Sequence, residues 1–176
     1  MELKSLEGCR LRIGSYPSFT YNAYGGGGKG TLLPSNANHI FYLSFSSKTF
    51  LIPPLTSGTT KFLSLPLPPF FKIEMSMDRL EGTINKNSGE VFLKFESKFI
   101  FSIGTMVKFP PILVNSSLQT GKVKGRLHAG EGVILQKNGK ATLVGISIIP
   151  ITGNKFLDIF LGLPNEAIAE LHCKIT

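Results

Sequence analysis

Residues 72–103 alternate between apolar and polar side chains over almost their whole length. Odd positions carry the apolar residues of two runs, 73–77 and 91–103, and even positions carry mostly charged or hydroxyl side chains. Successive side chains of a strand point to opposite faces, so the pattern predicts strands with one dry and one solvated face. Asn-Lys-Asn-Ser-Gly at 85–89 separates the runs and is typical of a tight turn. The segment therefore predicts one long antiparallel hairpin.

Charge pairing favours one register for this hairpin, since opposite charges across a strand pair contribute about 0.2–1 kcal/mol. Four pairs define that register: Glu74 with Lys98, Asp78 with Lys94, Ile73 with Phe99, and Met77 with Phe95. Arg79, Glu81 and Ser97 then interrupt the apolar face. We expect that face to open to solvent at these positions, or a β-bulge to shift the alternation there.

The rest of the chain reads as short β-rich runs separated by Gly, Pro, Asn and Ser. We expect further strands at 9–16, 19–24, 29–33, 40–45, 49–52, 112–114, 122–128, 133–136, 141–149, 156–161 and 169–175. Asn165 is expected to cap one helical turn over 166–168. The predicted fold class is all-β: a single antiparallel β-barrel or a strongly curled two-sheet sandwich of about 10–12 strands, with at most one short helix near the C-terminus.

Composition agrees with one globular domain spanning residues 1–176. Hydrophobic residues make up 42% of the chain and charged residues 17%, which excludes a disordered chain. The 14 Phe, 19 Gly and 11 Pro favour strands and turns over long helices. The N-terminus lacks a signal-peptide pattern, and no apolar run approaches the ~20 residues of a transmembrane helix. We therefore expect an intracellular protein, soluble or peripheral to a membrane, unless a targeting segment precedes this sequence.

Two cysteines, Cys9 and Cys173, lie near the two ends of the chain. A curled sheet that brings its first and last strands together would allow a disulfide between them. Buried thiols are the commoner outcome when cysteines are this few. We expect two buried thiols, with the disulfide as the alternative.

The net charge of +8 favours an anionic partner, although a solvated surface with excess lysine gives the same balance. A strand over 122–128 would place four basic side chains on one face, because they are spaced by two: Lys122, Lys124, Arg126 and His128. Such a stripe suits the phosphates of an anionic membrane surface. The alternatives are an ordinary solvated face or charges that protect an edge strand. Nucleic acid is disfavoured, since no aromatic residues alternate with the basic ones.

The glycine-rich segment 24–31 does not match a phosphate-binding P-loop. That motif needs a glycine where Ala23 stands and a Ser or Thr where Gly30 stands, and Pro34 follows too soon for the required helix. A flexible hairpin tip at the four glycines 25–28 is the better interpretation, and it allows close approach of another backbone. No cofactor is expected from the sequence.

The Leu- and Pro-rich segment 53–69 is unusually apolar for a region that prolines keep out of a central strand. An apolar loop must cap a core, cover a ligand cavity, or meet a partner or bilayer. Together with the dry face of the long hairpin, it supplies the candidate ligand-binding residues. These are Phe62, Leu65, Leu67, Phe70, Met75, Met77, Phe95 and Phe99.

Few residues point to enzymatic chemistry. The histidines His39, His128 and His172 show no metal-ligand spacing, and no nucleophile motif occurs. Asp158, inside the apolar run 156–161, is the best candidate for a carboxylate with a perturbed pKa. The alternative is that this side chain points outward to solvent.

The sequence is therefore most typical of a non-enzymatic β module that binds a lipid or other apolar small molecule, with a membrane surface as a second contact. An alternative is a structural or assembly factor. It would bind a membrane-associated protein complex through the apolar loop 53–69 and the basic strand 122–128. A third reading is an enzyme that acts on an apolar substrate inside the same fold.

Overall fold

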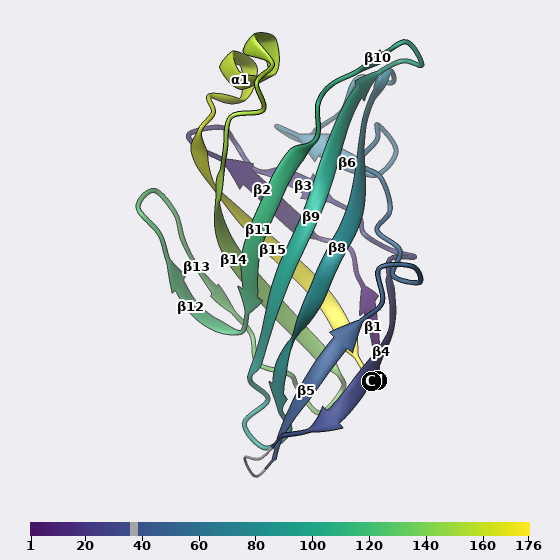
Figure 1. Ribbon diagram of the computed structural model, residues 1–176, viewed down its shortest axis with the longest axis vertical. Helices are drawn as coiled ribbons and strands as arrows, with labels where there is room; N and C mark the ends of the chain where they lie inside the picture. Colours follow the sequence, from purple (N-terminus) through teal and green to yellow (C-terminus); the bar gives the residue numbers. More distant parts are fainter. Residues whose placement is uncertain (36–38) are drawn as a thin grey trace.

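A computed structural model describes residues 1–35 and 39–176 of the chain (Figure 1). Thirteen strands form one antiparallel sheet that curls strongly around an apolar interior, and two further strands form a small separate hairpin. A single short helix lies near the C-terminus among the described residues. The all-β prediction is confirmed, as a strongly curled antiparallel sheet with at most one short helix.

The structure bounds the elements as follows. The strands are β1 (Glu2–Ser5), β2 (Cys9–Ile13), β3 (Phe19–Tyr21), β4 (Gly27–Pro34), β5 (Ile40–Phe45), β6 (Thr60–Phe62), β7 (Leu65–Pro66), β8 (Phe71–Asn85), β9 (Val91–Ile103), β10 (Val107–Lys108), β11 (Ile112–Gln119), β12 (Gly121–Lys124), β13 (Ala129–Gly132), β14 (Lys140–Ile149) and β15 (Asn165–Ile175). The helix is α1 (Lys155–Leu161).

The last strand closes the sheet. One edge of β15 pairs with β14 from Asn165 to Lys174. The other edge pairs with β2 in its first half, where Ala169 faces Leu11, and with β1 at its end, where Ile175 faces Leu3. The strands β1, β4, β5, β8, β9, β11, β14 and β15 thereby form a ring of eight. From β2 the sheet branches into β3, β6 and β7.

The long hairpin exists, but its register differs from the predicted one by three residues next to the turn and by two residues beyond an irregularity between Met77 and Arg79. Met75, not Ile73, lies opposite Phe99, and Ser76 lies opposite Lys98. The turn selects this register: the Gly89 N–H donates to the Asn85 carbonyl at 2.8 Å, and Gly89 has a φ of 76°. Exposed charge pairs contribute too little to override a turn. In the half of the hairpin away from the turn, the shift of two leaves residues 71–77 on their expected faces.

A β-bulge between Met77 and Arg79 confirms the predicted change of phase. Beyond it the even positions turn inward, so Leu80 is buried. Arg79 is exposed, where its Nε lies 2.7 Å from the Glu81 carboxylate. Ser97 remains on the inner face, and its buried Oγ has no hydrogen-bond partner among the described residues.

Several predicted elements are wrong. Residues 156–161 belong to helix α1, because the Asn154 side chain accepts the Leu157 N–H at 3.0 Å and Gly162 ends the helix with a φ of 64°. A short apolar run does not by itself discriminate strand from helix. The predicted helical turn 166–168 lies within β15, and β1 was not predicted. Residues 49–52 and 133–136 form isolated bridges in place of strands.

The predicted hairpin tip at the four glycines is also wrong, because β4 begins at Gly27 and pairs with β1. The second part of that interpretation, close approach of a backbone, is correct. Gly27 has a φ of 120°, and a Cβ there would lie 1.9 Å from the Leu3 carbonyl oxygen. The position therefore accepts no side chain without separating β4 from β1.

Both cysteines are free and buried, as expected for buried thiols. Burial raises the pKa of the Cys173 thiol to about 12 and also raises the pKa of Cys9. Their hydrogen bonds run to backbone carbonyls: Cys9 Sγ donates to Leu6 O at 3.3 Å, and Cys173 Sγ donates to Ala141 O at 3.7 Å. The thiols are held in the protonated form, which is poorly reactive.

Three apolar clusters fill the interior. The largest lies inside the ring of eight strands and includes Leu3, Leu43 and Leu93. A second lies beneath α1 around Leu157 and Leu161. The third joins β2, β3 and the segment that contains Leu55.

We predict that Gly27→Ala lowers the free energy of unfolding by about 2 kcal/mol or more, because the new Cβ collides with backbone at a positive φ. Gly58→Ala is the matched control, since the nearest atom to its Cβ would be Thr56 Oγ1 at 3.8 Å. Urea denaturation followed by circular dichroism measures both. Equal stability of the two variants would contradict the assigned contact between β4 and β1.

Candidate functional site

An internal cavity of about 320 Å³ lies between the curled sheet, its side branch and α1. The long hairpin forms one wall with large apolar side chains. From β8 and β9 these are Phe71, Ile73, Phe95, Phe99 and Phe101. They alternate inward by the same period-two pattern that predicts the hairpin.

The side branch forms the facing wall. Leu11 and Ile13 project from β2, and Phe19 of β3 stacks on Phe62 of β6 with ring centroids 4.7 Å apart. Leu67 continues this wall after β7. The Leu- and Pro-rich segment therefore covers the cavity with hydrocarbon side chains.

Small side chains on the third wall leave the space open. Ala167 and Ala169 of β15 and Ser147 of β14 line the cavity where the other walls carry Phe, Ile or Leu. Because alternate positions on β15 are small, the interior of this half of the molecule is not filled by its own side chains. The largest cluster, inside the ring of eight strands, is by contrast packed with leucines.

Among the residues that the structure describes, no charged side chain lines the cavity. The Ser116 hydroxyl donates to the Ile146 carbonyl at 3.3 Å, and the Tyr16 hydroxyl donates to the Phe160 carbonyl. These hydroxyl hydrogens are therefore not free to recognise a ligand. A cavity with such a lining favours hydrocarbon over water.

The cavity reaches the surface beside α1. Three of its lining residues are also exposed, namely Tyr16, Pro68 and Phe160. Leu161 of the same helix is buried against the interior. We call this exposed end the mouth of the cavity.

Asp158 belongs to α1 and does not line the cavity. Its carboxylate accepts hydrogen bonds from Thr152 N and Thr152 Oγ1, both at 2.7 Å, and from Gly153 N at 3.2 Å. The Thr152 hydroxyl contributes most to lowering the pKa of Asp158. Asp158 therefore stabilises the turn before the helix, as an ionised group with a structural role.

The eight candidate ligand-binding residues are divided among several places. Phe62, Leu67, Phe95 and Phe99 line the cavity. Leu65 and Phe70 are exposed. Met75 packs in the cluster around Leu55, and Met77 packs in the largest cluster, inside the ring of eight strands. The contributions of β2, β11, β15 and α1 were not predicted. The alternating Ala167 and Ala169 are the signal that marks a small-residue wall.

The predicted basic stripe is wrong in part. Lys122 and Lys124 are exposed on β12, but this strand ends at Lys124, and His128 is 8% exposed. His128 Nε2 is buried without a hydrogen-bond partner among the described residues. Arg126 stays exposed in the turn between β12 and β13. The basic side chains therefore do not share one strand face.

Glu166 is the physical reason, and no local sequence pattern indicates its role. This carboxylate is 4% exposed and accepts the backbone N–H groups of Arg126, Leu127 and His128 at 2.7, 2.9 and 2.7 Å. Burial opposes ionisation, but the three N–H donors together outweigh it and lower the pKa of Glu166. The ionised side chain bends the chain after β12 and anchors the small hairpin to β15.

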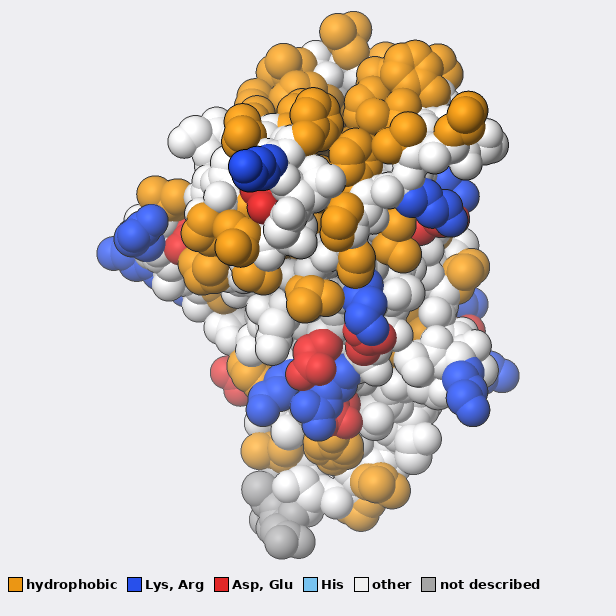
Figure 2. Space-filling view, turned by 45° about the horizontal axis from the view of Figure 1, so that its top comes forward, with side chains coloured by type: hydrophobic (Ala, Val, Ile, Leu, Met, Phe, Trp, Pro, Cys, Tyr) orange, Lys and Arg blue, Asp and Glu red, His pale blue; other side chains and the backbone are white. Residues whose placement is uncertain are grey.

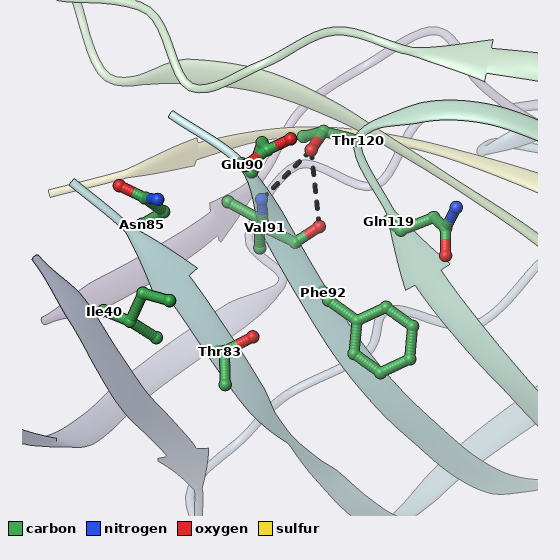
Figure 3. Close-up of a pocket in the computed structure, with 8 residues that line it drawn as sticks. All are labelled: Ile40, Thr83, Asn85, Glu90, Val91, Phe92, Gln119 and Thr120. Atoms are coloured by element: carbon green, nitrogen blue, oxygen red, sulfur yellow. Dashed lines mark hydrogen bonds between the residues drawn. The ribbon is translucent and has the colours of Figure 1, made fainter. Parts of the chain in front are cut away.

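Two other pockets lie on the surface. One, of about 280 Å³, is drawn in Figure 3, where Thr83, Phe92 and Gln119 lie on neighbouring strands β8, β9 and β11. Thr120 Oγ1 there accepts the Val91 N–H at 3.0 Å and so holds the strands together. The other, of about 330 Å³, is lined by exposed residues such as Glu7 and Lys140. Neither pocket is bounded by apolar side chains on all sides.

The remaining observations do not identify an activity. Within residues 1–35 and 39–176, no group of His, Cys, Asp and Glu side chains could hold a metal ion, and no helix has the length and hydropathy to cross a membrane. Comparisons with protein-family models, curated proteins and solved structures found no match. Function must be inferred from the residues of the site itself.

We predict that the turn after β12 depends on the ionisation of Glu166. Because the pKa of this group is lowered by folding, its contribution is complete above the ordinary Glu value of about 4.3 and is lost as the pH falls through the lowered pKa. Hydrogen exchange of the Arg126–His128 amides should show high protection factors at neutral pH and lower ones under acid conditions.

Glu166→Gln should reduce these protection factors by roughly tenfold or more at neutral pH, since the charge-assisted hydrogen bonds are weakened. Glu131→Gln is the control, because Glu131 is exposed on β13 of the same hairpin. If both variants reduce protection equally, Glu166 is not the anchor.

Proposed function

We propose that this protein binds a molecule with an apolar chain inside the cavity, without covalent chemistry. The observation that supports the proposal is an internal cavity of about 320 Å³ that is lined, within the described part of the chain, by uncharged side chains. This volume lies near the lower limit of the roughly 300–1,000 Å³ typical of small-molecule sites. It suits one hydrocarbon chain or one small apolar molecule.

The lining selects against a polar ligand. A hydroxyl or amide buried there would find few partners, at a cost of roughly 1–3 kcal/mol for each unsatisfied group. A ligand with a polar head group would therefore place its chain inside and its head at the mouth, beside Tyr16 and Phe160. Fatty acyl and isoprenoid compounds have this chemistry.

Packing also favours an apolar ligand. Protein interiors are close-packed, and the side chains around a space of about 320 Å³ have few neighbours on the side that faces it. A hydrocarbon chain in this space would supply those contacts.

We predict that the neutral fluorophore N-phenyl-1-naphthylamine binds the protein, and that Ala169→Phe weakens this binding by roughly tenfold or more, because the ring fills the space beside β15. Fluorescence titration measures the affinity. Ala129→Phe is the matched control, since Ala129 is exposed on β13.

Thermal unfolding of each variant shows whether it is folded. If Ala169→Phe does not fold, Ser147→Phe tests the same space from β14. Absence of binding to the wild type, or equal affinity in a folded cavity variant, would contradict the proposal. Native mass spectrometry of protein purified from its own host would identify the ligand.

A further inference from the structure

Exposed apolar side chains gather around the mouth of the cavity. Figure 2 shows them covering the end of the molecule that carries α1, whereas charged side chains are spread over the rest of the face in view. We define the rim by six residues: Phe70, Met106, Val107, Phe156, Ile159 and Phe160. Met106 is 92% exposed and Ile159 is 80% exposed. A group of this kind marks an interaction surface.

The three segments of the rim are fixed to one another. The Gly104 N–H donates to the Phe70 carbonyl at 2.8 Å, which joins the turn before β10 to the start of β8. Phe109, just after β10, stacks on Phe156 of α1 with ring centroids 5.7 Å apart. The rim is therefore a surface built by the fold, although its residues lie far apart in the sequence.

The rim is continuous with the cavity. Phe160 belongs to both, and its ring lies 6.4 Å from that of Phe101, a cavity-lining residue. A hydrocarbon chain that leaves the cavity at this end meets apolar side chains before it meets water.

Basic side chains surround the rim. Arg12, Lys72, Lys108 and Lys155 are exposed, and the three lysines lie within two residues of Phe70, Val107 and Phe156 of the rim. Glu74 and Asp158 are the acidic residues nearest to these segments in the sequence. Lys72 pairs with Glu74 at 2.6 Å, and Asp158 is committed to the turn before α1. Arg12 Nε donates to the carbonyl of Tyr16, a mouth residue. No salt bridge within the described part of the chain includes Arg12, Lys108 or Lys155.

We propose that the rim docks on an anionic lipid bilayer, with its apolar side chains among the acyl chains and its basic side chains beside the lipid phosphates. The choice of a bilayer over a protein rests in part on the proposed function, because an apolar ligand exchanges poorly through water. The rim side chains carry no hydrogen-bonding group that would recognise a partner protein. The mouth then opens toward the lipid phase.

Flotation with lipid vesicles tests this proposal. The wild type should bind vesicles of phosphatidylcholine with about one fifth phosphatidylglycerol, and bind roughly tenfold more weakly to phosphatidylcholine alone or at high salt. The double variant Met106→Glu/Ile159→Glu should lose roughly a hundredfold in affinity for the anionic vesicles, since two charges enter the interface. Leu33→Glu is the control, because Leu33 is 54% exposed on β4. The carboxyl end of β4 lies at the other end of the molecule from α1 (Figure 1).

Two comparisons separate this proposal from cavity binding. The rim double variant should still bind N-phenyl-1-naphthylamine, whereas Ala169→Phe should still bind anionic vesicles. If neither the wild type nor Ala169→Phe binds vesicles, docking is wrong while cavity binding stands. If the wild type binds anionic vesicles but does not bind N-phenyl-1-naphthylamine, cavity binding is wrong while docking stands.

Two further results would overturn docking. One is unchanged vesicle binding in the rim double variant with unchanged thermal stability. The other is a concentration-dependent dimer, seen by light scattering, that the same two substitutions abolish and that does not bind vesicles. In that case a second copy of the chain occupies the rim.

Discussion

The pairing of β15 with three different strands is the constraint on which the architecture depends. One of its edges is occupied by β14 from end to end, while the other is shared between β2 and β1. Where β15 meets β1, the sheet closes into a ring and the interior is packed with leucine. Where it meets β2, the sheet continues outward into β3 and β6. Because of this branch, the wall formed by β2, β3 and β6 lies apart from the long hairpin, and the cavity lies between the two.

Side-chain size explains why that space is not filled. The long hairpin contributes phenylalanines, but Ala167 and Ala169 on β15 are too short to reach them. Packing at ordinary interior density would need larger residues on β15.

Local patterns predicted the parts of the fold that local physics determines. Alternation identified the hairpin and its dry face, and it offered the bulge beside Arg79 as one of two alternatives, because period and phase are properties of neighbouring residues. The register failed because it was argued from charge pairs, whereas the turn at Gly89 sets it. The apolar run of helix α1 is short enough to read as a strand, and the Asn154 cap is what makes it helical.

The candidate site was harder to predict because it depends on strand partners. Phe95 and Phe99 could be placed on an inner face from their spacing, but nothing local says that β2 and β15 lie across from them. The same limit applies to Glu166, whose three N–H partners lie about 40 residues earlier in the chain. A glutamate within an apolar alternating strand carries no sign of a distant backbone turn.

The helical form of residues 155–161 connects the cavity with the rim. A strand over the same residues would send alternate side chains to two faces, with Phe156, Asp158 and Phe160 on one of them. In the helix, Leu157 and Leu161 are buried against the interior, while Phe156 and Ile159 face outward. Phe160 lies at the boundary, exposed at the rim and lining the cavity. This short helix therefore closes the apolar interior and extends it to the surface, which a strand at this position could not do.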